Sequence, residues 1–160
     1  MALVTSQSTE IHAEPEAVWS VITDIHNAAK VISGIKDIEV LEEPAGPGIV
    51  GLKWKETREW LGKDAVEVMW ITDADAPAFY ETRAESHGAV YQSRMELEPT
   101  ENGTHLTMLF NCQPVTLGAK IMWALTGWMA KKSLFKVIDQ DLKDVKNAVE
   151  RLERPEDRSS

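Results

Sequence analysis

The 160-residue sequence contains only one cysteine, Cys112. A single cysteine excludes an internal disulfide and a metal site built from several thiolates. Basic residues are also scarce, because 17 Lys and Arg stand against 26 Asp and Glu and leave a net charge of −9. Nucleic-acid affinity depends on the neutralisation of phosphates by Lys and Arg, so this balance argues against a nucleic-acid partner.

Long apolar runs are missing as well. The longest covers residues 121–130, between Lys120 and Lys131, and is too short to span a bilayer. The first residues, MALVTSQ, do not combine a basic region with an apolar run. We therefore expect no signal peptide and a cytoplasmic location.

The sequence does not indicate a metal or cofactor site. The glycines near residue 48 form a turn signal and not a phosphate-binding loop. Cys112 lacks an identifiable base partner, which favours a role as a small apolar filler. The histidines lack the spacing of metal ligands, so we expect no metal and no cofactor. These histidines are His12, His26, His87 and His105.

The length suffices for one domain with a substantial core, which we expect over residues 1–154, followed by a loose tail over 155–160. The clearest local pattern is an apolar stripe with gaps of three or four residues, which predicts an amphipathic helix over 133–153. The stripe consists of Leu134, Ile138, Leu142, Val145, Val149 and Leu152.

The rest of the chain is predicted to be mainly strands. A strand over 3–12 is followed by a helix that begins at Pro15 and by a short helix over 28–32. Short connections between the later strands imply antiparallel neighbours, so we expect an α+β fold. The remaining strands are predicted over 36–42, 49–60, 64–73, 78–86, 89–98 and 104–113.

Side-chain alternation predicts which face of the 78–98 hairpin lies inside. A two-residue turn at His87 and Gly88 would place Tyr91 opposite Ala84. Because apolar and polar side chains alternate on the second strand, the apolar set is assigned to the interior. The predicted inward residues are Tyr80, Thr82, Ala84, Tyr91, Ser93, Met95 and Leu97; on the last strand they are Leu106, Met108 and Phe110.

Two tryptophans and two charged residues share one face of the 49–60 strand. Trp54 and Trp60 lie on this face together with Glu56 and Arg58. A buried charge is unfavourable unless it is paired, so the two charges are expected to satisfy each other or the polar head of a ligand. The alternative interpretation is a solvent-facing salt bridge near a strand end.

The partner strand admits two registers. An odd-length loop at Gly62 would put Val66, Val68 and Trp70 inside, whereas an even-length loop would expose these three and bury Glu67. Because burying an acidic side chain beside an apolar face is unfavourable, we predict the odd-length loop.

Several segments together resemble a known superfamily. Residues 11–19 (IHAEPEAVW) follow the first strand and precede Asp24; Val50-Gly51 follows the turn, Gly103-Thr104 opens the last strand, and residues 141–146 (DLKDVK) lie in the final helix. This combination resembles SRPBCC proteins, which include polyketide cyclase/dehydrase-like proteins, START lipid-transfer domains and birch-pollen-allergen relatives. The resemblance covers nearly the whole chain. It implies the helix-grip fold, in which a curved antiparallel sheet of six to seven strands, with two short helices after the first strand, wraps around a long C-terminal helix and leaves a cavity. The superfamily shares no catalytic motif, so no functional residues carry over.

The expected cavity is rich in aromatic residues and methionine, a lining that adapts to apolar ligands. The first half of the terminal helix would form its roof, and the second half would pack as core. The alternative is a filled core without a cavity. The predicted ligand-binding residues are Trp54, Glu56, Arg58, Val68, Trp70, Tyr80, Tyr91, Met95, Met108, Phe110, Leu134, Ile138 and Leu142.

Three functions remain open on this basis. The first is binding, with transport as a variant, of a small hydrophobic molecule or lipid. The second is a polyketide cyclase/dehydrase-type enzyme that uses a polar pair in the same cavity, with Glu56 as the candidate catalytic residue because it is a titratable group on the predicted inner face. Hydroxyl groups from the two tyrosines would orient the ligand or donate a proton.

The third function is docking through residues 117–132. This segment is amphipathic and contains Trp123 and Trp128 between lysines. It is suited either to peripheral contact with a membrane or to a protein partner. The alternative is that the segment extends the terminal helix, with a kink at Gly127, and covers one end of the sheet.

Overall fold

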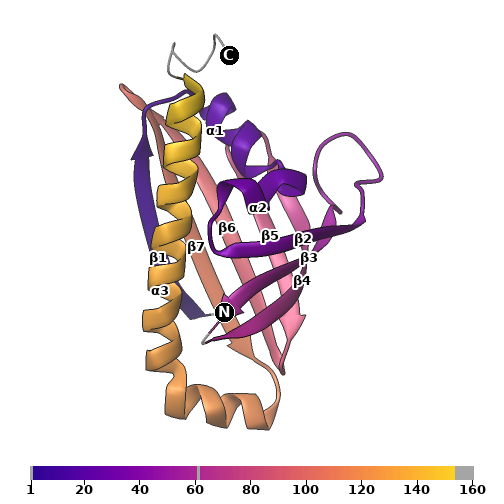
Figure 1. Cartoon of the computed structure of the whole chain (residues 1–160). Coiled ribbons are helices and arrows are strands. Elements are labelled where there is room, and N and C mark those ends of the chain that lie inside the picture. Colours follow the sequence, from indigo (N-terminus) through magenta and orange to yellow (C-terminus); the bar gives the residue numbers. More distant parts are fainter. Residues whose placement is uncertain (1, 61, 154–160) are drawn as a thin grey trace.

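A seven-stranded antiparallel sheet forms the frame of the protein (Figure 1). The computed structural model describes residues 2–60 and 62–153, apart from the side chains of residues 2–4 and 128. The spatial order is β1-β7-β6-β5-β4-β3-β2, so β1 and β2 are the edges. The strands are β1 (Ala2–Ile11), β2 (Ile35–Glu42), β3 (Lys53–Trp60), β4 (Lys63–Asp75), β5 (Phe79–Ser86), β6 (Ala89–Thr100) and β7 (Gly103–Pro114).

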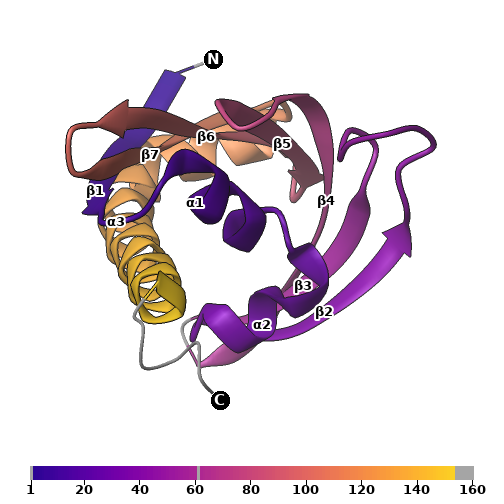
Figure 2. The ribbon, with the colours of Figure 1, turned by 90° about the horizontal axis from the view of Figure 1, so that it is seen from above.

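Short helices follow β1, and one long helix ends the described chain. The short ones are α1 (Pro15–Ile22), the 3-10 turn η1 (Ile25–Asn27) and α2 (Ala28–Val31), and the long one is α3 (Leu117–Glu153). Figure 2 shows the strands curving around α1, with α3 beside β1. This arrangement confirms the predicted helix-grip fold. The predicted tail over 155–160 lies outside the described residues.

The end of the molecule next to α1 is a closely packed core. Ile11, Val18 and Leu106 are almost completely buried there. The hydroxyl of Thr104, which is also fully buried, donates a hydrogen bond of 2.7 Å to the carbonyl of Ala13. This contact ties the start of β7 to the segment that leads into α1, and it satisfies a polar group that would otherwise be buried without a partner.

The β3–β4 hairpin does not adopt the predicted register. Trp60 pairs with Lys63, which leaves a two-residue connection, and Gly62 has a φ of +79° that favours glycine. Val68 and Trp70 therefore lie on the outer face, where the Lys53 ammonium stands 5.8 Å from the Trp70 ring centroid. Val66 is outside as well and is 48 % exposed. The even-length loop instead turns Ala65, Glu67 and Met69 inward.

The β5–β6 hairpin has the predicted register, with Ala84 opposite Tyr91. Its two-residue turn uses positive φ angles at His87 and Gly88, as the right-handed twist of the strands requires. The carbonyl of Gly88 accepts hydrogen bonds from the amides of Val115 at 2.7 Å and Thr116 at 3.2 Å. The tip of this hairpin therefore fixes the position from which α3 starts.

Helix α3 is 37 residues long, so the segment 117–132 extends the terminal helix, as one of the two interpretations predicted. Figure 1 shows a short first part crossing the lower end of the sheet before the helix bends and runs upward beside β1. Ile138 and Val149 are buried as predicted, but Leu152 is 61 % exposed because the stripe continues past the surface that covers it. Within the described ranges, no helix is long and apolar enough to cross a membrane.

Candidate functional site

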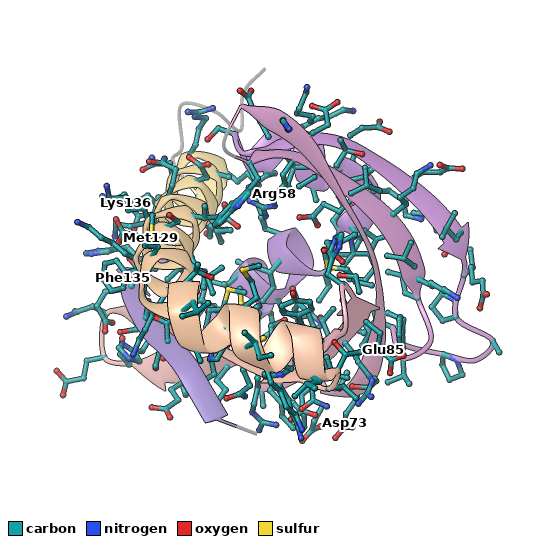
Figure 3. All side chains as sticks on the ribbon, turned by 90° about the horizontal axis from the view of Figure 1, so that it is seen from below. Arg58, Asp73, Glu85, Met129, Phe135 and Lys136 are labelled. Carbon is teal, nitrogen blue, oxygen red and sulfur yellow. The ribbon has the colours of Figure 1, made fainter. Side chains whose placement is uncertain are left out.

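Between the inner face of the sheet and α3 lies a cavity of about 560 Å³. This volume falls within the range of small-molecule sites in proteins. The short helices close it from one end, and the first part of α3 contributes Trp123 and Ala130 at the other. The view from below in Figure 3 shows Arg58 reaching from β3 toward α3 across this interior. The alternative of a completely filled core is therefore not what the chain adopts.

Most residues predicted for the lining do lie on the cavity wall. The exceptions are Val68 and Trp70, which the β3–β4 register places outside. The predicted residues found on the wall are Trp54, Glu56, Arg58, Tyr80, Tyr91, Met95, Met108, Phe110, Leu134, Ile138 and Leu142. Residues that sequence reasoning missed include Ala65, Glu67, Met69, Asp141 and the short-helix side chains Val21, Ile22, Ile25, Val31 and Ile32.

The sheet side of the wall is mainly apolar. Met95 and Met108 are cross-strand neighbours on β6 and β7, and the rings of Tyr91 and Phe110 lie 6.0 Å apart. Ser93 stands between these pairs and is the cross-strand neighbour of Phe110. Flexible thioethers beside aromatic rings form a surface that adjusts to apolar molecules of different shapes.

A buried ion cluster interrupts this apolar wall. The Arg58 guanidinium donates from Nε to Glu56 Oε1 at 2.5 Å, and from Nη1 and Nη2 to the two Asp141 carboxylate oxygens at 3.1 and 2.7 Å. The Trp54 indole donates to Glu56 Oε2 at 3.3 Å. Glu56 is only 8 % exposed, so the cluster is an interior feature and not the solvent-facing pair that the alternative interpretation described.

Arg58 and Asp141 have shifted pKa values. Burial lowers the pKa of Arg58, but hydrogen bonds and attraction from Asp141 and Glu56 outweigh it and raise the pKa above the ordinary value. For Asp141, burial raises the pKa, and repulsion from Glu56 adds to the rise. The hydrogen bonds and the charge of Arg58 lower this pKa, but they offset the rise only in part. The guanidinium is therefore the hydrogen-bonding and electrostatic partner that the two buried carboxylates share.

A third carboxylate faces the cavity from β4. Glu67 is the direct cross-strand partner of Glu56 on the inner face. Its two carboxylate oxygens lie 2.9 and 2.8 Å from the Ser86 hydroxyl oxygen, which shares its single hydrogen between them. Like charges directly opposite each other on neighbouring strands are destabilising. The fold therefore retains an unfavourable pair at this position, a deviation of the kind that is concentrated at functional sites.

Tyr80 is oriented by its surroundings and holds the short helices in place. Its hydroxyl donates to the carbonyl of Ile22 at 3.2 Å, and its ring meets Trp19 edge-on at 5.9 Å between centroids. Burial, and secondly the charge of Glu56, raise the pKa of Tyr80. The Tyr80 hydroxyl is therefore a neutral donor that is already engaged with the backbone.

Among the described residues, no three His, Cys, Asp or Glu side chains gather closely enough to hold a metal ion. Cys112 is buried in a small cluster with Ala89, against which Tyr91 and Trp123 pack. Burial raises the pKa of the Cys112 thiol, which keeps it in the unreactive protonated form. This environment is that of a packing residue.

Comparisons with known proteins agree with this architecture. The model of the family described as "Polyketide cyclase / dehydrase and lipid transport" matches residues 2–150. No curated protein matches the chain significantly. Among solved structures, the protein TTHA0849 from Thermus thermophilus is 14 % identical at a TM-score of 0.78, over 94 % of this chain and 99 % of that one.

Two further solved structures show the same fold. A START superfamily protein from Mycobacterium smegmatis is 18 % identical at a TM-score of 0.74, over 92 % of this chain and 97 % of that one. The Zhui aromatase/cyclase from a Streptomyces species is 16 % identical at a TM-score of 0.69, over 94 % and 95 % of the two chains. At these identities the similarity establishes the fold alone.

Proposed function

Because the chain belongs to the polyketide cyclase/dehydrase and lipid transport family, we propose that it binds a small hydrophobic molecule or lipid in the cavity between its sheet and α3. The observation that carries this proposal is the cavity itself, which combines a largely apolar wall with one fixed polar cluster. Apolar walls supply affinity, and a few fixed polar groups supply orientation. Transport of the ligand is the natural extension if release occurs at a membrane.

The charges of the cavity favour a particular polar group on the ligand. Arg58 is already engaged by Glu56 and Asp141, and Glu67 adds another acceptor on the same wall. Ionised carboxylates only accept hydrogen bonds. We therefore expect the polar end of the ligand to donate hydrogen bonds, as an amine or a hydroxyl does.

Native mass spectrometry of gently purified protein tests the proposal directly, with a bound mass as the expected result. A titration series then compares an alkyl amine, an alcohol and a fatty acid of equal chain length, each competing with the fluorescent probe ANS. We expect the fatty acid to bind at least about tenfold more weakly than the amine, because its carboxylate would meet like charge. An empty protein that binds neither ANS nor any member of the series would contradict the proposal.

A second candidate function is catalysis of the cyclase or dehydrase type on a polyketide. The facing pair Glu56 and Glu67 favours it, because two carboxylates with different partners can divide the roles of acid and base. Glu56 is held by two donors, whereas Glu67 is held by the hydroxyl of Ser86.

The Glu56→Gln variant separates catalysis from binding. We expect it to bind a poly-β-ketone analogue with nearly wild-type affinity, because the amide oxygen still accepts a hydrogen bond from Trp54 or Arg58. If Glu56 acts in catalysis, turnover falls at least about a hundredfold. Equal turnover in wild type and variant would remove Glu56 as the catalytic residue.

A further inference from the structure

The exposed large apolar side chains of the described residues are concentrated on one segment. Seven of the eleven lie between residues 115 and 135. Contiguous apolar surface of this kind usually marks an interaction site. These seven are Val115, Leu117, Ile121, Met122, Leu125, Met129 and Phe135, with exposed fractions between 51 and 75 %. We call the first part of α3, residues 117–132, the arm.

The two sides of the arm have different surroundings. Leu117, Ile121 and Leu125 follow one another at intervals of four and therefore share a face of the helix. Trp123 and Ala130 lie on the other side, where they line the cavity. Figure 3 shows Met129, Phe135 and Lys136 at the outer side of α3, away from the interior. The arm thus covers the cavity with one face and exposes an apolar face that no other described residue covers.

The charge of this region is opposite to that of the whole chain. No Asp or Glu occurs between residues 102 and 138, although the chain as a whole has a net charge of −9. Four exposed lysines lie in this interval, and within the described residues none forms a salt bridge, whereas Lys36, Lys55 and Lys143 do. The four are Lys120, Lys131, Lys132 and Lys136.

We propose that the arm is the docking surface for a lipid bilayer that carries anionic headgroups. Its apolar side chains would enter the boundary between headgroups and acyl chains, and the lysines would contact lipid phosphates. The acidic remainder of the molecule is repelled by the same surface, which sets the orientation with the arm against the bilayer. A symmetric contact between two arms would instead bring the unpaired lysines of both copies together.

Docking in this orientation also places one end of the cavity next to lipid, because Trp123 lines the cavity from the same helix. This gives a hydrophobic ligand a short path between bilayer and cavity. The docking is measured separately from ligand binding, because sedimentation with vesicles reports contact with the bilayer and not occupancy of the cavity.

The test is sedimentation of the full chain with phosphatidylcholine vesicles, with or without about 30 % phosphatidylserine. We expect binding only to the anionic vesicles, and weaker binding as salt is added. The double variant K131Q/K132Q should bind on the order of thirtyfold more weakly, as the loss of two surface lysines predicts. The variant I121S/L125S should bind the anionic vesicles at least about tenfold more weakly, because it lacks two apolar side chains that would enter the bilayer.

Matched controls remove the same number of lysines or of exposed apolar side chains elsewhere on the surface. K30Q/K55Q removes two lysines from α2 and β3, and L41S/V50S removes two exposed apolar side chains far from α3. Both controls should bind as wild type does. Circular dichroism verifies folding, and because surface lysines do not hold the core, K131Q/K132Q remains decisive if I121S/L125S fails to fold.

Three results would overturn the proposal. The first is wild-type protein that does not sediment with anionic vesicles. The second is equal binding by wild type and K131Q/K132Q. The third is wild-type protein that forms a stable dimer in light scattering and does not bind vesicles, while the I121S/L125S variant is a monomer. That result would assign the arm to contact with a second copy of the chain.

Discussion

Replacing Arg58 with methionine is expected to lower the free energy of unfolding by about 3–5 kcal/mol. The guanidinium is the shared partner of Glu56 and Asp141, whose side chains are only 9 and 15 % exposed. Methionine fills a similar volume but leaves both carboxylates without their cation. The cost of removing these two carboxylates from water is then no longer offset by an ion pair. Chemical denaturation at neutral pH measures the effect.

Arg94 provides a matched control on the outer face of the sheet. It also donates to two carboxylates, from Nε to Glu96 and from Nη1 to Glu81, each at 2.6 Å. Its partners are 35 and 39 % exposed, so solvent screens the interaction and compensates for its loss. Arg94→Met should therefore change stability by less than about 1 kcal/mol. Equal losses in the two variants would mean that burial of the Arg58 cluster has no energetic consequence.

The loss in free energy of unfolding that Arg58→Met causes should depend on pH. Burial already raises the pKa of Asp141, and Arg58 supplies the opposing interactions. Without Arg58 the pKa in the folded state rises further above the unfolded value, and a carboxyl with a raised folded pKa is more stabilising when protonated. The difference between wild type and variant should therefore shrink as pH falls through that raised pKa. A difference that grows on acidification would contradict this assignment.

Replacing Ser93 with phenylalanine is expected to weaken ligand binding about a hundredfold, which corresponds to about 2.7 kcal/mol. Ser93 lines the cavity between Thr82 and Phe110, so a phenyl ring at this position occupies the volume available to the ligand. Because the ring fills a void, thermal stability should be unchanged or slightly higher. Displacement of ANS by the alkyl amine measures the affinity.

Gln92→Phe is the appropriate control for this variant. Gln92 precedes Ser93 on β6 and pairs with Arg83 and Asn111, so its side chain points to the opposite face of the sheet. The same ring added there should leave the affinity at the wild-type value. If Ser93→Phe bound as tightly as Gln92→Phe, the ligand would have to bind outside the cavity.

The fold could be predicted because local patterns agreed with one another. The His87–Gly88 turn gave the pairing of Ala84 with Tyr91, and the alternation on β6 gave the inward face of the hairpin. The stripe from Leu134 to Val149 required a surface of similar length, which β1 and α1 provide. Agreement between turn chemistry and side-chain period leaves few alternative arrangements.

The β3–β4 register could not be predicted by the same logic. The predicted register requires every inward position to belong to a dry core, where Glu67 would be unfavourable. In the structure this position faces a cavity, and Ser86 on the next strand supplies a donor. This requirement is therefore not met at a place where the sheet has a polar interior.

Asp141 was missed for a related reason. Its position, three residues after Ile138 and one before Leu142, puts it at the edge of the buried face of α3. Sequence spacing relates residues within one helix, but the pairing with Arg58 joins α3 to β3 across the cavity. Only the three-dimensional closure of the sheet brings these groups together.

The pairing of β1 with β7 has a consequence for the order of assembly during synthesis. Ala2 pairs with Cys112 and Ile11 with Thr104, so the first strand stays unpaired until most of the chain has left the ribosome. Such distant contacts slow folding because the entropy of the long intervening loop is lost before they form. Helix α3 packs on β1 and comes later still. The cavity therefore forms only when the two ends of the chain have met, and deletion of β1 should abolish the ligand site instead of shortening it.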